Sequence, residues 1–239
     1  MKSLATLAGT LLLALSQSAS AVPLLTNGNF EAGLAGWTVT DQAGGSGSWF
    51  AETGTVMPLS GGTTVGPLPG STTYAVTDQG GPGTHALTQS FTVAPGASSV
   101  ILRFNMFVNS YAPFTDNGGV LDYLPGPAQF GRVDLLTETA GAFDTGLADV
   151  LQNFYLNIDD PLLNPNPYMA YEFNITSLVG AGGTFQLRFA EVDNQLFLNM
   201  GVDNVDITAL YEEVPEPGSL ALLALGTGAL ALARRRRPA

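Results

Sequence analysis

The chain has 239 residues, and its 20 acidic residues outnumber its eight Lys and Arg. It has no cysteine, which excludes disulfides, zinc–thiolate sites and cysteine nucleophiles, and its single histidine, His85, excludes a metal site built from several histidines. Residues 22–213 contain three arginines against 19 acids, a net charge of −16. Such an acidic body repels phosphate backbones, which argues against a nucleic-acid partner.

Residues 1–21 have the layout of a secretory signal peptide. Lys2 precedes an apolar run over residues 4–15, and Ala19-Ser20-Ala21 then supplies the small residues that signal peptidase requires at its cleavage site. A buried N-terminal helix is the alternative, but the run has no charged residue to give it an amphipathic face. We therefore expect signal peptidase to leave a body that begins near Val22.

Residues 22–213 are predicted to form one all-β domain. In the clearest strand, apolar residues at 100, 102, 104, 106 and 108 alternate with polar ones such as Arg103 and Asn105. Four further runs show the same alternation: residues 87–93, 171–175, 185–189 and 205–209. The best helical candidate, residues 147–156, is short. Short strands that recur between turn signals indicate a β-sandwich or a jelly roll.

Two long segments, residues 44–71 and 111–130, are predicted to be loops. Long loops in a compact domain commonly carry binding sites. Trp49 and Tyr123 lie in these segments and are the candidate platforms on which a sugar ring could stack. The alternative is that both aromatic rings belong to the core, where aromatic residues of β domains are most often found.

One short sequence recurs within the body. Val39-Thr40-Asp41-Gln42 is repeated as Val76-Thr77-Asp78-Gln79, and a looser copy occurs at Asp193-Asn194-Gln195. Two interpretations stay open. The copies are strand ends that enter glycine-rich turns, where aspartate bonds its own backbone, or they are acidic loops that meet around a ligand.

The two ends of the body carry further motifs, Asn27-Gly28-Asn29-Phe30-Glu31 with Gly36-Trp37 at the start and Gly201-Val202-Asp203-Asn204-Val205 at the finish. They resemble the opening and closing strands of galactose-binding-like jelly rolls, the sandwiches of many carbohydrate-binding modules. The resemblance implies that the two segments lie side by side, that Trp37 plugs the sandwich, and that Glu31 and Asp203 hold a structural Ca²⁺ with backbone carbonyls. Here the closing motif reads Asp-Asn-Val, where Asp-Asp-Val is commoner.

A carbohydrate-active hydrolase is the alternative class of protein. It would need two carboxylates about 5–9.5 Å apart, and three pairs could supply them: Asp159 and Asp160, Asp203 and Asp206, and Glu191 and Asp193. No nucleophile elbow, zinc-protease motif or phosphate loop occurs in the sequence. A non-catalytic role is therefore preferred, and Arg188 is expected to be structural, paired with one of the many acids.

The C-terminal segment, residues 214–239, begins with Val214 and the motif Pro215-Glu216-Pro217. Apolar residues 220–233 follow, shorter than the 17–25 residues or so of a stable membrane span. The segment closes with four arginines, Arg234, Arg235, Arg236 and Arg237, which would stay on the cytoplasmic side and stop translocation. This tail resembles the PEP-CTERM sorting signal of Gram-negative, exopolysaccharide-producing bacteria, in which exosortase reads the Pro-Glu-Pro motif and the tail is removed.

These features together predict an exported, exosortase-sorted protein of the cell surface or of the extracellular exopolysaccharide matrix of a biofilm. It would be anchored transiently in the inner membrane by a short transmembrane helix. The body is expected to bind glycan, Ca²⁺ or both, with signal peptidase and exosortase as processing partners.

Overall fold

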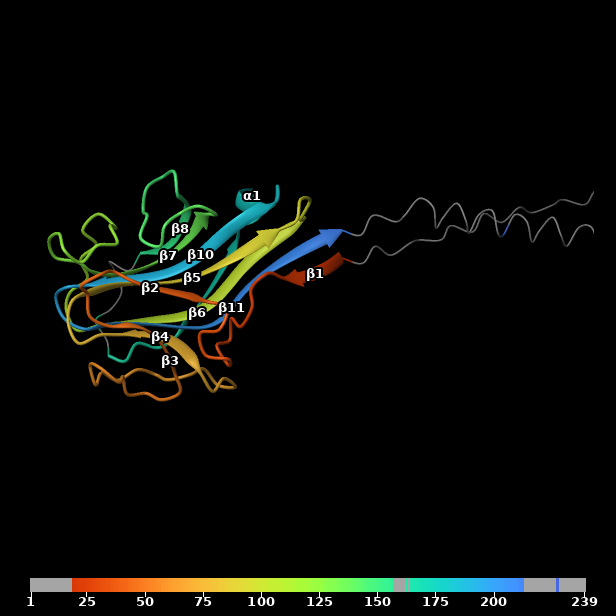
Figure 1. Ribbon diagram of the computed structural model, residues 1–239. Coiled ribbons are helices and arrows are strands. Elements are labelled where there is room, and N and C mark those ends of the chain that lie inside the picture. Colours follow the sequence, from red (N-terminus) through yellow and green to blue (C-terminus); the bar gives the residue numbers. More distant parts are fainter. Residues whose placement is uncertain (1–18, 157–161, 163, 213–226, 228–239) are drawn as a thin grey trace, which may run out of the picture. The chain divides into compact units, whose positions relative to one another are not determined.

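The computed structural model describes residues 19–156, 162, 164–212 and 227, and its main compact unit is Ala21–Tyr211. This unit consists of two β-sheets packed face to face (Figure 1). The first sheet has the order β3 (Ser48–Glu52), β4 (Tyr74–Asp78), β11 (Leu198–Glu212), β6 (Ser99–Ser110) and β9 (Met169–Asn174), with β1 (Ala19–Pro23) pairing with β11. The second has the order β2 (Thr38–Asp41), β5 (Gly83–Val93), β10 (Gly183–Asp193), β7 (Gln129–Thr137) and β8 (Val150–Leu156).

The eight strands from β4 to β11 have jelly-roll connectivity. Numbered one to eight along the chain, they lie in the order 1-8-3-6 in one sheet and 2-7-4-5 in the other, which is the double Greek key of that fold. Neighbouring strands pair antiparallel throughout these two sets. The prediction of an all-β jelly roll is therefore confirmed, and β2 and β3 extend the edges of the two sheets.

The core between the sheets follows the predicted alternation. On β6 the five apolar side chains that share one face are at most 2% exposed: Val100, Leu102, Phe104, Met106 and Val108. Trp37 also lies in this core, with its ring 5.4 Å from that of Phe30 and 6.1 Å from that of Phe189. It plugs the sandwich, as expected. A single turn of helix, α1 (Thr176–Val179), adds Val179 to the same core.

Two predicted segments differ from the structure. Residues 147–156 do not form a helix, because their second part is the edge strand β8, paired antiparallel with β7. Its β-branched and aromatic residues, Val150, Phe154 and Tyr155, suit a strand better than a helix. Residues 44–71 are not a continuous loop either, since β3 lies within them and pairs with β4.

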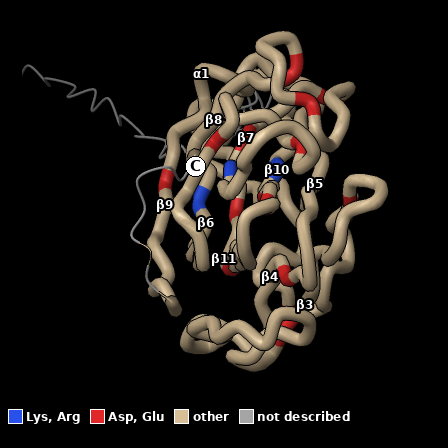
Figure 2. Tube along the Cα trace, turned by 90° about the vertical axis from the view of Figure 1, so that its left-hand side faces the viewer, with Lys and Arg blue, Asp and Glu red and all other residues tan. Residues whose placement is uncertain are grey.

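The three arginines of the body are all paired with acids, and Figure 2 shows how few cationic positions there are. Arg188 is fully buried and contacts Asp134 at 2.6 Å. Asp134 also accepts a bond of 2.7 Å from Arg132. Burial raises the pKa of Asp134, but hydrogen bonds from Arg132 and the charge of Arg188 outweigh it, so that the pKa lies below its ordinary value. Arg188 is thus a structural residue, as predicted.

We expect Asp134→Asn to lower the free energy of unfolding by about 3–5 kcal/mol, because it leaves Arg188 buried without its counter-charge. The matched control is Glu172→Gln, which removes the exposed partner of Arg103 and should change stability by less than about 0.5 kcal/mol. Denaturant unfolding of the full chain at neutral pH measures both.

The pH dependence of this difference has a fixed sign. Since folding lowers the pKa of Asp134, its contribution is complete above the ordinary aspartate pKa of about 4 and is lost as the pH falls through the folded value. The difference in unfolding free energy between the native chain and Asp134→Asn should therefore shrink as the pH falls below about 4. A gap that widens below pH 4 would contradict this assignment.

Candidate functional site

Of the connections that the structure describes in full, four meet at one end of the sandwich, namely those between β2 and β3, β4 and β5, β6 and β7, and β10 and β11. Asp41, Asp78 and Asp193 are the last residues of β2, β4 and β10. The three copies of the recurring sequence therefore all mark strand ends, and all three strand ends lie at this end of the fold.

Polar side chains fill the interior at this end. In the antiparallel pairing of β5 with β10, Leu87 lies opposite Phe189, and His85 lies opposite Glu191 two residues further along. Because alternate residues of a strand share a face, His85 and Glu191 continue the inner face that carries the core. Asp193 follows on the same face, and the exposure of these three residues is 0%, 0% and 2%.

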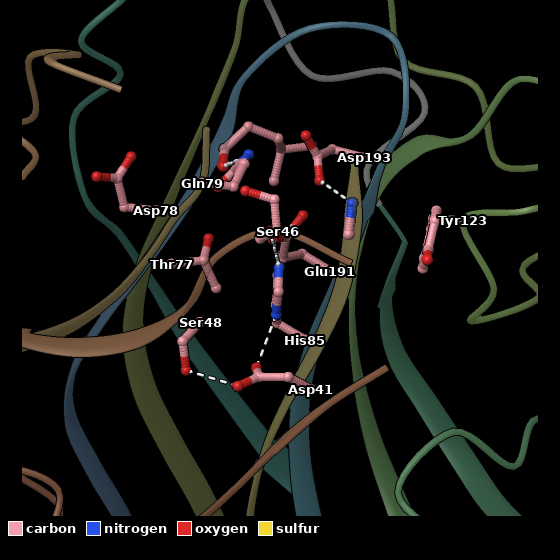
Figure 3. Close-up of polar contacts among 12 residues, drawn as sticks. Asp41, Ser46, Ser48, Thr77, Asp78, Gln79, His85, Tyr123, Glu191 and Asp193 are labelled. Atoms are coloured by element: carbon pink, nitrogen blue, oxygen red, sulfur yellow. Dashed lines mark hydrogen bonds and ion pairs between the residues drawn. The ribbon is translucent and has the colours of Figure 1, made fainter. Parts of the chain in front are cut away.

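His85 is held by contacts at both ring nitrogens (Figure 3). Its Nδ1 lies 2.7 Å from Oδ1 of Asp41, whose other oxygen accepts a hydrogen bond of 2.9 Å from the Ser48 hydroxyl. An ionised carboxylate only accepts, so Nδ1 carries a proton and donates it to Asp41. Nε2 lies 3.0 Å from the carbonyl oxygen of Ser46.

Glu191 is the least satisfied group of the cluster. Both of its carboxyl oxygens are buried and accept no hydrogen bond from the described residues, and Oε1 is 3.9 Å from Nε2 of His85, beyond hydrogen-bonding distance. Burial raises the pKa of Glu191 well above its ordinary value, and neighbouring aspartates, Asp193 first among them, raise it further. Leaving such a group unsatisfied costs about 1–3 kcal/mol, and more when it is charged.

Asp193 links the buried cluster to the surface. Its Oδ1 accepts a bond of 3.1 Å from the backbone N–H of Gly83, and burial raises its pKa to about 7. One ligand-type atom from each of His85, Glu191 and Asp193 lies within 4.8 Å of the others. Gly83 gives this group its room, because a β-carbon there would overlap Nε2 of His85 and lie 2.6 Å from the Ser46 carbonyl oxygen.

A cavity of about 160 Å³ lies beside Asp193, lined by Gly81, Pro82 and residues 193–197. Leu196 is 56% exposed, and the ring of Phe197 meets that of the exposed Tyr111 edge-on at 6.2 Å. This pocket rim, defined as Tyr111, Leu196 and Phe197, combines apolar surface with the carboxylate and amides of residues 193–195. Together with the buried cluster it forms the candidate site.

The two predicted sugar-stacking residues, Trp49 and Tyr123, lie in different places, one in the core and one near the pocket. Trp49 lies in β3, is 3% exposed and packs in the core between the sheets, so its ring offers no face to a sugar. It sits in a glycine-rich stretch that looks like a loop in the sequence, but strand pairing turns its side chain inward. Tyr123 is half-buried, stands apart from the cluster (Figure 3), and its carbonyl accepts a bond of 2.6 Å from the Asn194 side chain, at the pocket.

The opening and closing motifs lie side by side, as the resemblance implies. The N–H of Val205 donates to the carbonyl of Gly28 at 2.8 Å, and a β-carbon at Gly28 would overlap Val205. Glu31 is exposed and accepts a bond of 2.7 Å from the backbone of Thr72. Asp203 is buried, which raises its pKa, and the charge of Glu31 adds to this rise.

The other predicted site residues either lie apart from the buried cluster or fall outside the described residues. Asp206 accepts a bond of 2.6 Å from the hydroxyl of Thr208 on its own strand. Asp159 and Asp160 lie outside the described residues, as do the Pro-Glu-Pro motif and the four terminal arginines. The expected hydrophobic helix at residues 220–233 also lies outside them, apart from Thr227. Within the described ranges, no helix has the length and apolar character needed to cross a membrane.

The buried cluster was not predicted as a unit, although a signal for it exists. Extending the alternation of β10 beyond Leu187 and Phe189 places Glu191 and Asp193 on the core face. A carboxylate at a core position is unusual, because acids are almost never fully buried unless paired. His85 occupies the equivalent position on β5.

Comparison with known families identifies the tail. Residues 213–237 match the PEP-CTERM protein-sorting motif. The chain therefore carries a signal for export and sorting to the cell envelope of Gram-negative bacteria, as the tail indicated. No curated protein matches the chain.

Solved structures similar to this chain have low sequence identity to it. The enzymatically active domain of tailspike protein 4 of bacteriophage CBA120 has 13% identity and a TM-score of 0.45, covering 79% of this chain and 21% of its own. This chain thus spans about a fifth of that phage protein. The carbohydrate-binding module TmCBM61, in complex with β-1,4-galactotriose, has 10% identity and a TM-score of 0.43, covering 80% and 99%. The family 11 carbohydrate-binding module from Clostridium thermocellum has 14% identity and a TM-score of 0.40, covering 79% and 96%.

Proposed function

We propose that this chain is an exosortase-processed protein of the cell surface or exopolysaccharide matrix, whose jelly roll binds glycan without cleaving it. The observation that carries the proposal is the order of its parts, a jelly-roll unit over Ala21–Tyr211 followed by a sorting motif over residues 213–237. A signal of this kind sorts the body to the cell envelope. Signal peptidase would remove residues 1–21.

The pocket rim supports the glycan part of the proposal. Sugar rings present apolar faces and hydroxyl edges, and ligand sites of proteins usually combine apolar side chains with a few convergent polar groups. Phe197, Leu196 and Tyr111 offer the apolar surface, and residues 193–195 offer carboxylate and amide groups beside it. Tyr123, tied to Asn194, stays a candidate at the border of the same pocket.

The burial of Glu191 supports binding over hydrolysis. A glycosidase must bring two carboxyl groups to opposite sides of a sugar, about 5–9.5 Å apart. Of the pair Glu191 and Asp193, Glu191 is completely buried and both carboxyl groups contribute to one cluster of atoms within 4.8 Å. Of these two carboxyl groups, a sugar bound in the pocket would contact only that of Asp193.

A structural Ca²⁺ at Glu31 and Asp203 belongs to the same proposal. The donor set fits this ion, because Ca²⁺ prefers carboxylate and carbonyl oxygens. The two acids come from opposite ends of the body, which the Gly28–Val205 contact joins, and the charge of Glu31 adds to the rise in the pKa of Asp203. A cation there would relieve this repulsion.

The sorting step is tested by Glu216→Ala expressed in the native host. If exosortase reads the Pro-Glu-Pro motif, the variant should keep its tail and stay with the membrane fraction, whereas the native chain is cut. Mass spectrometry of the C terminus measures this, with Glu212→Ala, which precedes the matched residues 213–237, as the control. Normal cleavage of Glu216→Ala would contradict the assignment.

Glycan binding is tested by retention of the full chain on the host's own exopolysaccharide. Phe197→Ala should weaken binding about tenfold, the equivalent of 1.4 kcal/mol, because it removes an aromatic side chain that lines the pocket. Leu147→Ala is the matched control, since Leu147 is 98% exposed outside the pocket, and it should bind like the native chain. Assaying released reducing ends in the same samples separates the classes: product release would favour the hydrolase, and no retention at all would overturn the glycan proposal.

The calcium site is tested by thermal melting after a chelator has been removed by dialysis. Added Ca²⁺ should raise the melting temperature of the native chain by mass action, and Asp203→Asn or Glu31→Gln should abolish the rise. Asp206→Asn, on the same strand, should retain it. If Ca²⁺ does not change the melting temperature of the native chain, the proposed calcium site is absent.

A further inference from the structure

The cluster formed by His85, Glu191 and Asp193 is not explained by glycan binding or by the calcium site. It lies inside the sandwich, whereas the pocket rim lies at the surface, and it involves neither Glu31 nor Asp203. A jelly roll has no need of a buried carboxylate that accepts no hydrogen bond, because an apolar residue at that position would extend the core. The buried carboxylate of Glu191 therefore needs a partner that supplies positive charge or a proton.

We propose that the side chains of His85, Glu191 and Asp193 form a binding site for a divalent transition-metal ion such as Zn²⁺. The ligand-type atoms lie within 4.8 Å of one another, and Glu191 contributes two buried oxygens that accept no hydrogen bond from the part of the chain that the structure describes. The 3.9 Å between Nε2 of His85 and Oε1 of Glu191 is too long for a hydrogen bond but suits two ligands of one ion. A dication would balance the charges of both acids.

The orientation of His85 supports this inference independently. Its Nδ1–H donates to Asp41, which leaves Nε2 facing Glu191 and the Ser46 carbonyl. Histidines that bind metals usually donate their other ring N–H to a carboxylate in this way, which fixes the ring and raises its basicity. A bare Nε2 lone pair 3.0 Å from a carbonyl oxygen would be repulsive, so either a proton or a cation belongs beside it.

The donor set selects the kind of metal. One imidazole with two carboxylates is a mixed nitrogen and oxygen set, which suits Zn²⁺ and Mn²⁺ better than Ca²⁺, an ion that takes oxygen ligands. Three protein ligands leave a coordination position for water or for the Ser46 carbonyl. Asp193 also lines the cavity beside the cluster, which provides a route for the ion.

The test uses the full chain carrying a tag without histidine, because a histidine tag would bind the same ions. After metal is stripped, Zn²⁺ at about 100 times its Kd should raise the melting temperature by about 5–10 °C, with one ion bound per chain. Glu191→Gln preserves the shape of the side chain and should abolish the rise, as should His85→Asn. Asp203→Asn is the matched control and should retain it.

A second readout does not depend on stability. Co²⁺ bound by the native chain should give a visible absorption band that is missing in Glu191→Gln, provided that the variant unfolds as cooperatively as the native chain. If Zn²⁺ binds equally well to Glu191→Gln, or if the native chain binds neither Zn²⁺ nor Mn²⁺, a proton occupies the cluster and the proposal is overturned. These outcomes are independent of glycan retention and of the response to Ca²⁺.

Discussion

The antiparallel pairing of β5 with β10 is the constraint on which both the core and the candidate site depend. It places residues about a hundred positions apart opposite each other, with Leu87 facing Phe189 and, one repeat later, His85 facing Glu191. A shift of the register by one residue would turn every one of these side chains to the other face. The same hydrogen-bonded ladder therefore builds an apolar interior along most of its length and a polar interior at one end.

Both faces of β10 are buried, so the charged residues of this strand are removed from solvent whichever face they occupy. On its outer face Arg188 bonds Asp134 and the carbonyl oxygens of Ala142 and Asp144, so every charge there has a partner. On its inner face Glu191 has no comparable partner among the described residues. One strand thus shows two ways of burying a charge, one fully compensated by protein atoms and one that is not.

Much of the fold follows from the sequence, because the strands with one apolar face alternate clearly. The alternation of β6 and β10 predicts the buried face of both strands and most of the extent of β6, whereas β10 extends well beyond the predicted residues 185–189. The jelly roll follows from the resemblance of the two end motifs. The helix expected at residues 147–156 was wrong because an edge strand such as β8 gains its stability from pairing with β7, and no local pattern reports that pairing. Trp49 was misplaced for the same reason, since only its pairing with β4 makes it a core residue.

The site was predictable in its parts but not as a whole. The recurring Asp-Gln sequences correctly mark turns, and the structure adds that the strands they end converge at one end of the sandwich. Which of these acids is buried depends on the side of the sheet that each one faces. Asp78 bonds the backbone of Leu59 and Ser60, while Asp41 turns toward His85. The two have the same local sequence, and only the packing of the sheets makes one the acceptor for the backbone of a distant loop and the other the partner of a buried imidazole.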